Sequence, residues 1–283
     1  MLNRQRPHFH ARYADGNTID TNRVITHKLQ FTLRPFMKII PFVLLLIPFI
    51  VRANAESSTL EIHPIKENVY QHVSYLDVKP WGLVAANGLV VIEQQNAYII
   101  DTPWTIADTQ QLVSWIKSQG LVPKAALISH FHQDASNGIA YLDKVGIETY
   151  ASSLTNTLLA EQNRPQSSKS FTGHTLTLAN NSIEIFSPGA GHTKDNVVVW
   201  LEQHNLLFGG CFVKSLASKG LGNIADASVE QWPISLNNVL KKYPKIEQVV
   251  PGHGKIGDVK LLSHTVKLAR THMIEKTKKP NGQ

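Results

Sequence analysis

The sequence contains a single cysteine, Cys211, among its 283 residues, which excludes an intrachain disulfide framework. It also lacks any internal repeat at the period of roughly 20 to 50 residues that marks solenoids and propellers. Its longest apolar run, residues 39–51, has 13 residues and contains two prolines, whereas a membrane-spanning helix needs about 20 apolar residues. The chain is 42% hydrophobic, which excludes wholesale disorder and leaves enough apolar material for a large core.

Most of the chain carries almost no net charge, although the formal net charge of the whole sequence is +7. The first 55 residues hold eight basic and two acidic side chains, and the remaining 228 hold 20 basic and 19 acidic ones. A protein that binds a polyanion needs a basic field, and the body of this chain has almost none. We therefore expect no nucleic-acid partner.

The surplus of basic residues lies in the first 55 residues, the last part of which has the layout of a secretory signal peptide. Residues 37–55 have a short basic start with Lys38, continue with the apolar run and end on Ala53-Asn54-Ala55, which predicts cleavage before Glu56. The alternative, a retained anchor, is disfavoured because the run is short. We divide the chain into an upstream extension outside the native protein (residues 1–36), a signal peptide (37–55) and one mature domain (56–283), and expect a periplasmic protein without a stable membrane anchor.

Hydrophobic patterning predicts an α+β fold in which short strands come first and helices are interleaved later. Asn87-Gly88 between two apolar runs predicts a hairpin turn in residues 60–101. Thr105, followed by Asp108, predicts the start of a helix. Two sheets with helices on their outer faces account for this order. The later strands are expected at residues 124–129, 184–186, 197–201, 206–208 and 247–250, and the later helices at residues 137–145, 153–161, 229–243 and 259–274.

The strongest chemical signal is the spacing His130-x-His132-x-Asp134 at the end of an apolar strand. Alternate residues of an extended segment point to the same side. Two imidazoles and a carboxylate can therefore converge, and both groups are good zinc ligands. The alternative is a surface loop that happens to be rich in histidine.

Three further donors occur in comparable settings, each beside glycines near the end of an apolar strand. They are His192 in Gly-Ala-Gly-His-Thr, Cys211 in Gly-Gly-Cys and His253 in Pro-Gly-His-Gly. Taken singly, a buried cysteine is most often inert packing, and a loop histidine is most often a hydrogen-bonded residue. Together the six donors suffice for two zinc ions with three protein ligands each, and the open positions that remain are typical of catalytic zinc.

These residues, with the motifs around them, resemble the metallo-β-lactamase superfamily, and within it the imipenemase-type branch of the class B β-lactamases. The resemblance runs over nearly the whole mature chain. It implies an αβ/βα sandwich of two mostly antiparallel sheets with helices on the outer faces. The motifs that carry it are Trp81-Gly82-Leu83-Val84, Ile100-Asp101-Thr102-Pro103, Ser129-His130-Phe131-His132, Gly191-His192-Thr193, Asp195-Asn196-Val197-Val198-Val199-Trp200-Leu201, Leu207-Phe208-Gly209-Gly210-Cys211-Phe212 and Gly220-Leu221-Gly222-Asn223.

The resemblance also implies roles for particular residues and two Zn²⁺ per chain. His130, His132 and His192 would bind the first zinc, and Asp134, Cys211 and His253 the second. Lys214, Asn223 and Trp81 would contact the substrate, Asp134 and Asn223 would act in catalysis, and Asp101 would orient metal ligands. Zinc lowers the pKa of bound water to about 7. A zinc-bound hydroxide would then open the β-lactam ring of carbapenems, cephalosporins and penicillins. This activity would confer antibiotic resistance on the cell that exports the protein. We expect the protein to be a monomer.

Ala135-Ser136-Asn137 departs from the usual imipenemase-type residues after Asp134, and a second departure lies in the segment after Lys214. Ala135 stands where the glyoxalase-like branch has a metal-binding histidine, which favours the β-lactamase interpretation because Cys211 supplies the ligand instead. The segment between Lys214 and Asn223 is longer than in the imipenemase-type relatives, so the substrate profile stays open. The remaining alternatives are a thioester or lactone hydrolase of the same superfamily and a periplasmic zinc carrier. A serine β-lactamase is disfavoured, because the Ser-x-x-Lys motif at Ser114 lies within an amphipathic helical pattern.

Overall fold

The computed structural model describes residues 60–278, all within one compact unit. The expected upstream extension and signal peptide lie outside the described residues. Within the described part, no helix is both long enough and apolar enough to cross a membrane.

The first sheet contains seven strands whose order in space is their order in the sequence. Its first four strands are antiparallel to one another, and the pairs from the fourth strand to the seventh are parallel. The first four strands therefore form an antiparallel meander, in line with the expectation that short strands come first. The strands are β1 (Glu61–Lys66), β2 (Val69–Val78), β3 (Gly82–Glu93), β4 (Asn96–Ile100), β5 (Val122–Leu127), β6 (Glu148–Ser152) and β7 (Lys169–Phe171).

The second sheet contains five strands in the order β12-β11-β10-β9-β8. Only β11 and β12 pair in parallel; the other neighbours are antiparallel. The pattern in the sequence predicted four of these strands, whereas β8, and β6 and the short β7 of the first sheet, were missed. The strands are β8 (Thr175–Leu178), β9 (Ile183–Phe186), β10 (Val198–Leu201), β11 (Leu206–Gly210) and β12 (Gln248–Pro251).

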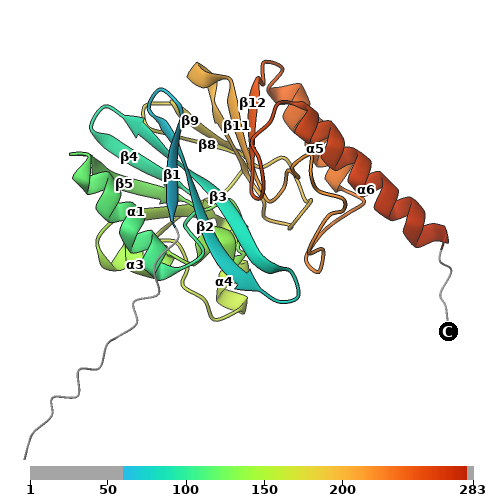
Figure 1. Cartoon of the computed structure of the whole chain (residues 1–283), viewed down its shortest axis with the longest axis horizontal. Coiled ribbons are helices and arrows are strands. Elements are labelled where there is room, and N and C mark those ends of the chain that lie inside the picture. The colour runs from blue at the N-terminus through green and yellow to red at the C-terminus, as the bar shows by residue number, and fades with distance from the viewer. Residues whose placement is uncertain (1–59, 279–283) are drawn as a thin grey trace, which may run out of the picture. The chain divides into compact units, whose positions relative to one another are not determined.

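Helices cover the outer faces of both sheets (Figure 1). The predicted start of α1 is confirmed, because Thr105 Oγ1 accepts a hydrogen bond from Asp108 N at 3.0 Å. The helix expected at residues 137–145 is confirmed as α3, and the short α2 before it was not predicted. The helices are α1 (Ile106–Ser118), α2 (Gln133–Ser136), α3 (Ile139–Lys144), α4 (Ser153–Glu161), the 3-10 helix Glu202–His204, α5 (Trp232–Lys242) and α6 (Lys260–Lys278).

The alternation of side chains along central strands explains the layers. On β10, Val199 packs in the core between the sheets, whereas Val198 and Trp200 pack with residues of α5 and α6. On β3, Leu89 faces the core between the sheets and Val90 packs against α1. Because central strands are apolar on both faces, each sheet packs against the other sheet on one face and against helices on the other. The αβ/βα sandwich is therefore confirmed.

The expected hairpin turn at Asn87-Gly88 is wrong. Both residues lie inside β3, where they pair with Val73 and His72 of β2. A Cβ atom at Gly88 would collide with the imidazole of His72, so this position needs glycine because of a close approach within the sheet. The turn between β2 and β3 lies instead at residues 79–81.

Candidate metal centre

His130 and His132 lie in the loop that follows the C-terminal end of β5, a strand in the parallel part of the first sheet. Their loop is fixed through Ser129, whose backbone N and Oγ both donate to the carboxylate of Asp101 at 2.6 Å. Asp101 comes directly after the neighbouring strand β4. Its position agrees with the orienting role implied by the family resemblance, because Ser129 Oγ also lies 3.1 Å from His130 Nδ1.

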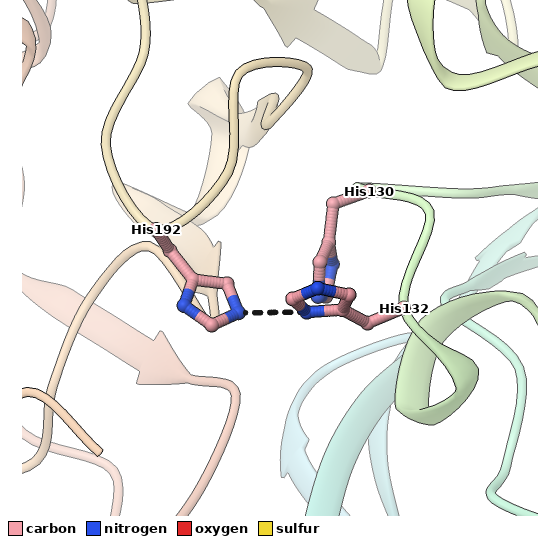
Figure 2. A group of neighbouring side chains, drawn as sticks. All are labelled: His130, His132 and His192. Carbon is pink, nitrogen blue, oxygen red and sulfur yellow. Dashed lines mark hydrogen bonds between the residues drawn. The ribbon is translucent and has the colours of Figure 1, made fainter. Parts of the chain in front are cut away.

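The second sheet brings His192 to the same place. Val197 N, at the start of β10, donates to Ser129 O at 2.9 Å, which ties the loop before β10 to the loop after β5. His132 Nδ1 and His192 Nε2 are 3.1 Å apart, and the ring centroids of His130, His132 and His192 lie 4.9 to 5.1 Å from one another (Figure 2). One nitrogen from each ring lies within 4.8 Å of the others. The three histidines therefore form one donor cluster.

The chemistry of this cluster fits a zinc ion. His130 Nε2 is buried and has no hydrogen-bond partner among the described residues. Burial lowers the pKa of His130 to about 3 and holds the pKa of His192 well below its usual value. Both rings are thus neutral near pH 7, the form in which imidazole binds metal.

A second cluster joins Asp134, Cys211 and His253. Cys211 Sγ lies 2.9 Å from Asp134 Oδ2 and 3.2 Å from His253 Nε2, and Asp134 Oδ2 lies 3.1 Å from His253 Nε2. Zinc ligands at about 2.0 to 2.3 Å in a tetrahedron are roughly 3.5 Å apart, so this triangle is close to the size that one ion needs. The two clusters are adjacent, because Asp134 Oδ1 is 3.5 Å from His130 Nε2.

The electrostatics of the second cluster also favour a cation. Burial and the nearby Asp134 raise the pKa of the Cys211 thiol well above its usual value. Burial alone would raise the pKa of Asp134 too, but the hydrogen bond with His253 and the neighbouring imidazoles lower it well below its usual range. A divalent ion would relieve this conflict, since it stabilises thiolate and carboxylate together.

Two protein oxygens orient the rings from outside. His253 Nδ1 donates to Ala85 O at 2.7 Å, which leaves Nε2 as the electron-pair donor that faces Cys211. His132 Nε2 lies 2.9 Å from Asp226 Oδ2, which leaves Nδ1 facing the cluster. No local pattern pointed to Asp226, which is 94 residues from its partner.

The loop that carries His253 is held against both sheets. Asn87 Nδ2 donates to Pro251 O and Gly254 O at 2.8 Å each, and Asn87 N donates to Gly252 O at 2.8 Å. A Cβ atom at Gly252 would lie 2.6 Å from Cys211 Sγ. Glycine at this position is therefore what lets the two ligand loops approach each other.

A cavity of about 410 Å³ opens onto both clusters. The predicted contact residues Trp81, Lys214 and Asn223 all line it. Trp104, which the sequence analysis did not single out, lines it as well, with its ring centroid 6.4 Å from that of His253. The lining also includes His132, His192, Asp134 and His253, whereas the buried donors His130 and Cys211 are not part of it.

Lys214 is nearly buried at the wall of this cavity. Its Nζ lies 5.4 Å from the centroid of the Trp232 ring. Within residues 60–278 no carboxylate oxygen is within ion-pair distance of Nζ. Burial lowers the pKa of Lys214, although Cys211 and Asp134 act in the opposite direction. A buried cation without a counter-ion marks this wall as a place for an anionic group.

Similarity to known proteins points to the same chemistry. No protein-family model matches the chain. The metallo-beta-lactamase type 2 of Pseudomonas aeruginosa is 43% identical over 235 residues, covering 82% of this chain and 94% of the relative. The metallo-beta-lactamase type 2 of Bacteroides fragilis is 36% identical over 246 residues, covering 84% and 98%.

Solved structures agree with this similarity. A crystal structure of the DIM-1 metallo-beta-lactamase exposed to ceftazidime matches with a TM-score of 0.74 and 47% identity over 75% of this chain and 97% of that one. The FIM-1 metallo-beta-lactamase from Pseudomonas aeruginosa, in its mono-zinc form, matches with a TM-score of 0.72 and 30% identity over 78% and 97%.

Proposed function

The chain belongs to the class B metallo-β-lactamases, zinc-dependent enzymes that hydrolyse β-lactams, and from this premise we propose that it opens the ring of carbapenems, cephalosporins and penicillins. The observation that carries the proposal is the pair of adjacent donor clusters, members of which line one cavity. His130, His132 and His192 would hold one zinc ion, and Asp134, Cys211 and His253 the other. Bound zinc supplies a hydroxide nucleophile near neutral pH and neutralises the negative charge that develops on the substrate.

Lys214 would bind the carboxylate that β-lactams carry next to the ring nitrogen. Its ammonium group is buried beside Trp232 without an ion-pair partner in the described part of the chain. An incoming carboxylate supplies that partner, and the surrounding apolar wall strengthens the interaction. This contact fixes the ring over the two clusters and acts as a binding interaction.

Asn223 and Trp81 would contact other parts of the substrate. Asn223 Oδ1 accepts a hydrogen bond from Ala225 N at 3.1 Å, so its Nδ2 is the atom available to donate to the carbonyl oxygen of the lactam. The exposed indole of Trp81, in the turn between β2 and β3, offers an apolar cover for the substrate and excludes water.

Asp134 would serve the reaction as well as the metal. Its Oδ2 takes part in the contacts with Cys211 and His253, whereas Oδ1 is the carboxylate oxygen directed toward the histidine cluster. Oδ1 therefore lies where it can orient the attacking water and hold a proton during the attack.

Metal removal tests the proposed function. We expect the purified mature chain to hydrolyse imipenem and a chromogenic cephalosporin, to lose this turnover on exhaustive chelation and to regain it with zinc. His192→Asn removes one donor and should abolish most of the activity, whereas His174→Asn changes an exposed histidine and should have no effect. Turnover that survives chelation, or turnover of thioesters and lactones alone, would contradict the proposal.

Export and oligomeric state have their own test. We propose that the enzyme acts in the periplasm as a monomer after removal of residues 37–55. The signal-peptide layout of residues 37–55 supports the export. Mass spectrometry of the periplasmic fraction should give a chain that begins at Glu56, and light scattering should give the mass of one chain. A mature chain that begins before Met37, or a stable dimer, would refute the corresponding part.

A further inference from the structure

Helix α6 contacts the backbone of Lys214 directly. Thr265, in the first half of this helix, is fully buried, and its Oγ1 accepts a hydrogen bond from Lys214 N at 2.8 Å. The same hydroxyl donates to Leu261 O at 2.8 Å, so its rotamer and its hydrogen position are both fixed. The amide of Lys214 is thereby attached to a rigid helix rather than to another loop.

The preceding residue of α6 holds the segment that follows Lys214. His264 Nε2 lies 2.9 Å from Ser218 O, and a carbonyl oxygen can only accept, so Nε2 carries the hydrogen. Ser218 N in turn donates to Ser215 O at 3.0 Å, and the two serine hydroxyls lie 3.2 Å apart. His264 and Thr265 thus hold a compact turn at two points.

Little else supports this turn. Leu216, Ala217, Lys219 and Gly220 are exposed, and only Leu221 at the far end packs into the core beside α5 and α6. A cavity of about 170 Å³ also lies against the turn, lined on one side by Lys214 itself. A loop that is exposed on one side and borders a void on the other depends on its hydrogen bonds for its position.

We propose that Thr265 and His264 are positioning residues that set where Lys214 presents its ammonium group and so determine the affinity for the carboxylate of the substrate. This inference rests on the proposed role of Lys214. The side chain of Lys214 packs along Trp232, so a shift of its backbone displaces Nζ from the place where an anion is bound. Neither Thr265 nor His264 touches the donor clusters, so the two residues act on binding without changing the metal ligands.

Variants of Thr265 test the inference. Thr265→Val keeps the shape and removes the acceptor, whereas Thr265→Ser keeps the hydroxyl. We expect Thr265→Val to raise KM for imipenem by roughly 5- to 10-fold, as the loss of one buried hydrogen-bond partner implies, with kcat within about 2-fold of the original. Thr265→Ser should restore KM, and Thr271→Val, at an exposed position of the same helix, should leave it unchanged.

A substrate without the charge gives the decisive comparison. For a cephalosporin whose carboxylate is esterified, Thr265→Val should leave KM within about 2-fold, because no carboxylate is present for Lys214 to bind. His264→Leu, at a half-buried site, gives a second variant in case Thr265→Val does not fold, and zinc content is measured for each.

The outcomes separate the inference from the proposed function. If Lys214→Ala raises KM for the free acid and Thr265→Val does not, the positioning role is overturned while the role of Lys214 stands. If Thr265→Val raises KM equally for acid and ester, or lowers zinc content, the effect is structural and the inference is wrong. If Lys214→Ala leaves KM unchanged, the proposed role of Lys214 fails, and the inference fails with it.

Discussion

His132 and His253 each have a second ring nitrogen whose hydrogen-bond partner decides which nitrogen is left for the metal. His132 and His253 give that second nitrogen to Asp226 and to the Ala85 carbonyl, respectively. Such outer contacts fix the tautomer and the plane of the ring before any ion arrives. The partners therefore matter as much for metal retention as the ligands do, although they are further from the reaction.

The contact between Asp226 and His132 leads to a prediction at this scale. Asp226→Asn keeps the shape of the side chain but removes its charge, and it should weaken zinc binding at the histidine cluster by roughly 10- to 100-fold. Competition with a chelator of known affinity measures the change. Asp77→Asn, at an exposed aspartate, is the control. Equal zinc affinity in the two variants would show that Asp226 plays no part in holding the ring.

His72 gives a prediction about pH. It is buried on β2, its Nε2 lies 3.1 Å from Asp101 O, and burial lowers its pKa from 6.5 to about 4. The unfolded chain binds this proton at a higher pH than the folded chain does. The stability due to neutral His72 is therefore complete above pH 6.5 and is lost as the pH falls toward 4.

We expect the metal-free His72→Gln variant to lose less stability on acidification than the original chain does. Between about pH 7 and about pH 4.5 the difference should be about 2 kcal/mol. Urea unfolding at each pH measures it, and chelation removes the contribution of metal binding. His174→Gln, at an exposed histidine, should behave as the original chain. Parallel pH profiles for His72→Gln and the original chain would rule out the linkage.

At the scale of elements, β3 acts as a support for the loop after β12. Asn87 reaches from the first sheet to the carbonyls of Pro251 and Gly254, on either side of His253 in the chain. Local turn chemistry predicted a hairpin at Asn87-Gly88, because an isolated Asn-Gly pair favours that conformation. The true partners of Asn87 are 164 and 167 residues away, and no local pattern contains them.

Asn87→Ala should accordingly affect the second metal more than the first. The variant loses both side-chain hydrogen bonds to the His253 loop, so we expect zinc affinity of the Asp134, Cys211 and His253 cluster to fall by about 10-fold or more. Metal titration followed by calorimetry resolves the two sites. Asn237→Ala on the exposed face of α5 is the matched control. A variant that retains two equally tight sites would contradict the supporting role.

At the scale of the whole molecule, the sequence predicted the layers and the six donors well. The alternation in His130-x-His132-x-Asp134 and the glycine loops at strand ends are local patterns with direct geometric meaning. The sequence did not predict Trp104, Asp226 or Asn87 as site residues, because their roles depend on contacts between distant segments. It also missed β6, β7 and β8; β7 and β8 have no fully buried side chain and so carry little hydrophobic signal.

Metal should also stabilise the fold as a whole. Each donor cluster takes ligands from both sheets, so an ion binds the folded arrangement and not the unfolded chain. At free zinc of roughly 100 times Kd, this linkage contributes about 2.7 kcal/mol. We expect the melting temperature to rise by roughly 5 to 10 °C. Calorimetry with and without chelator measures the shift, and His192→Asn should reduce it.

The chain passes from one sheet to the other through the exposed residues 172–174. A chain severed there gives one fragment that carries His130, His132 and Asp134 and another that carries His192, Cys211 and His253. Each donor cluster is split between the fragments, so neither half has a complete ligand set for either ion. Hydrolysis regained on mixing would then report the reunion of the halves, with zinc as the link between them.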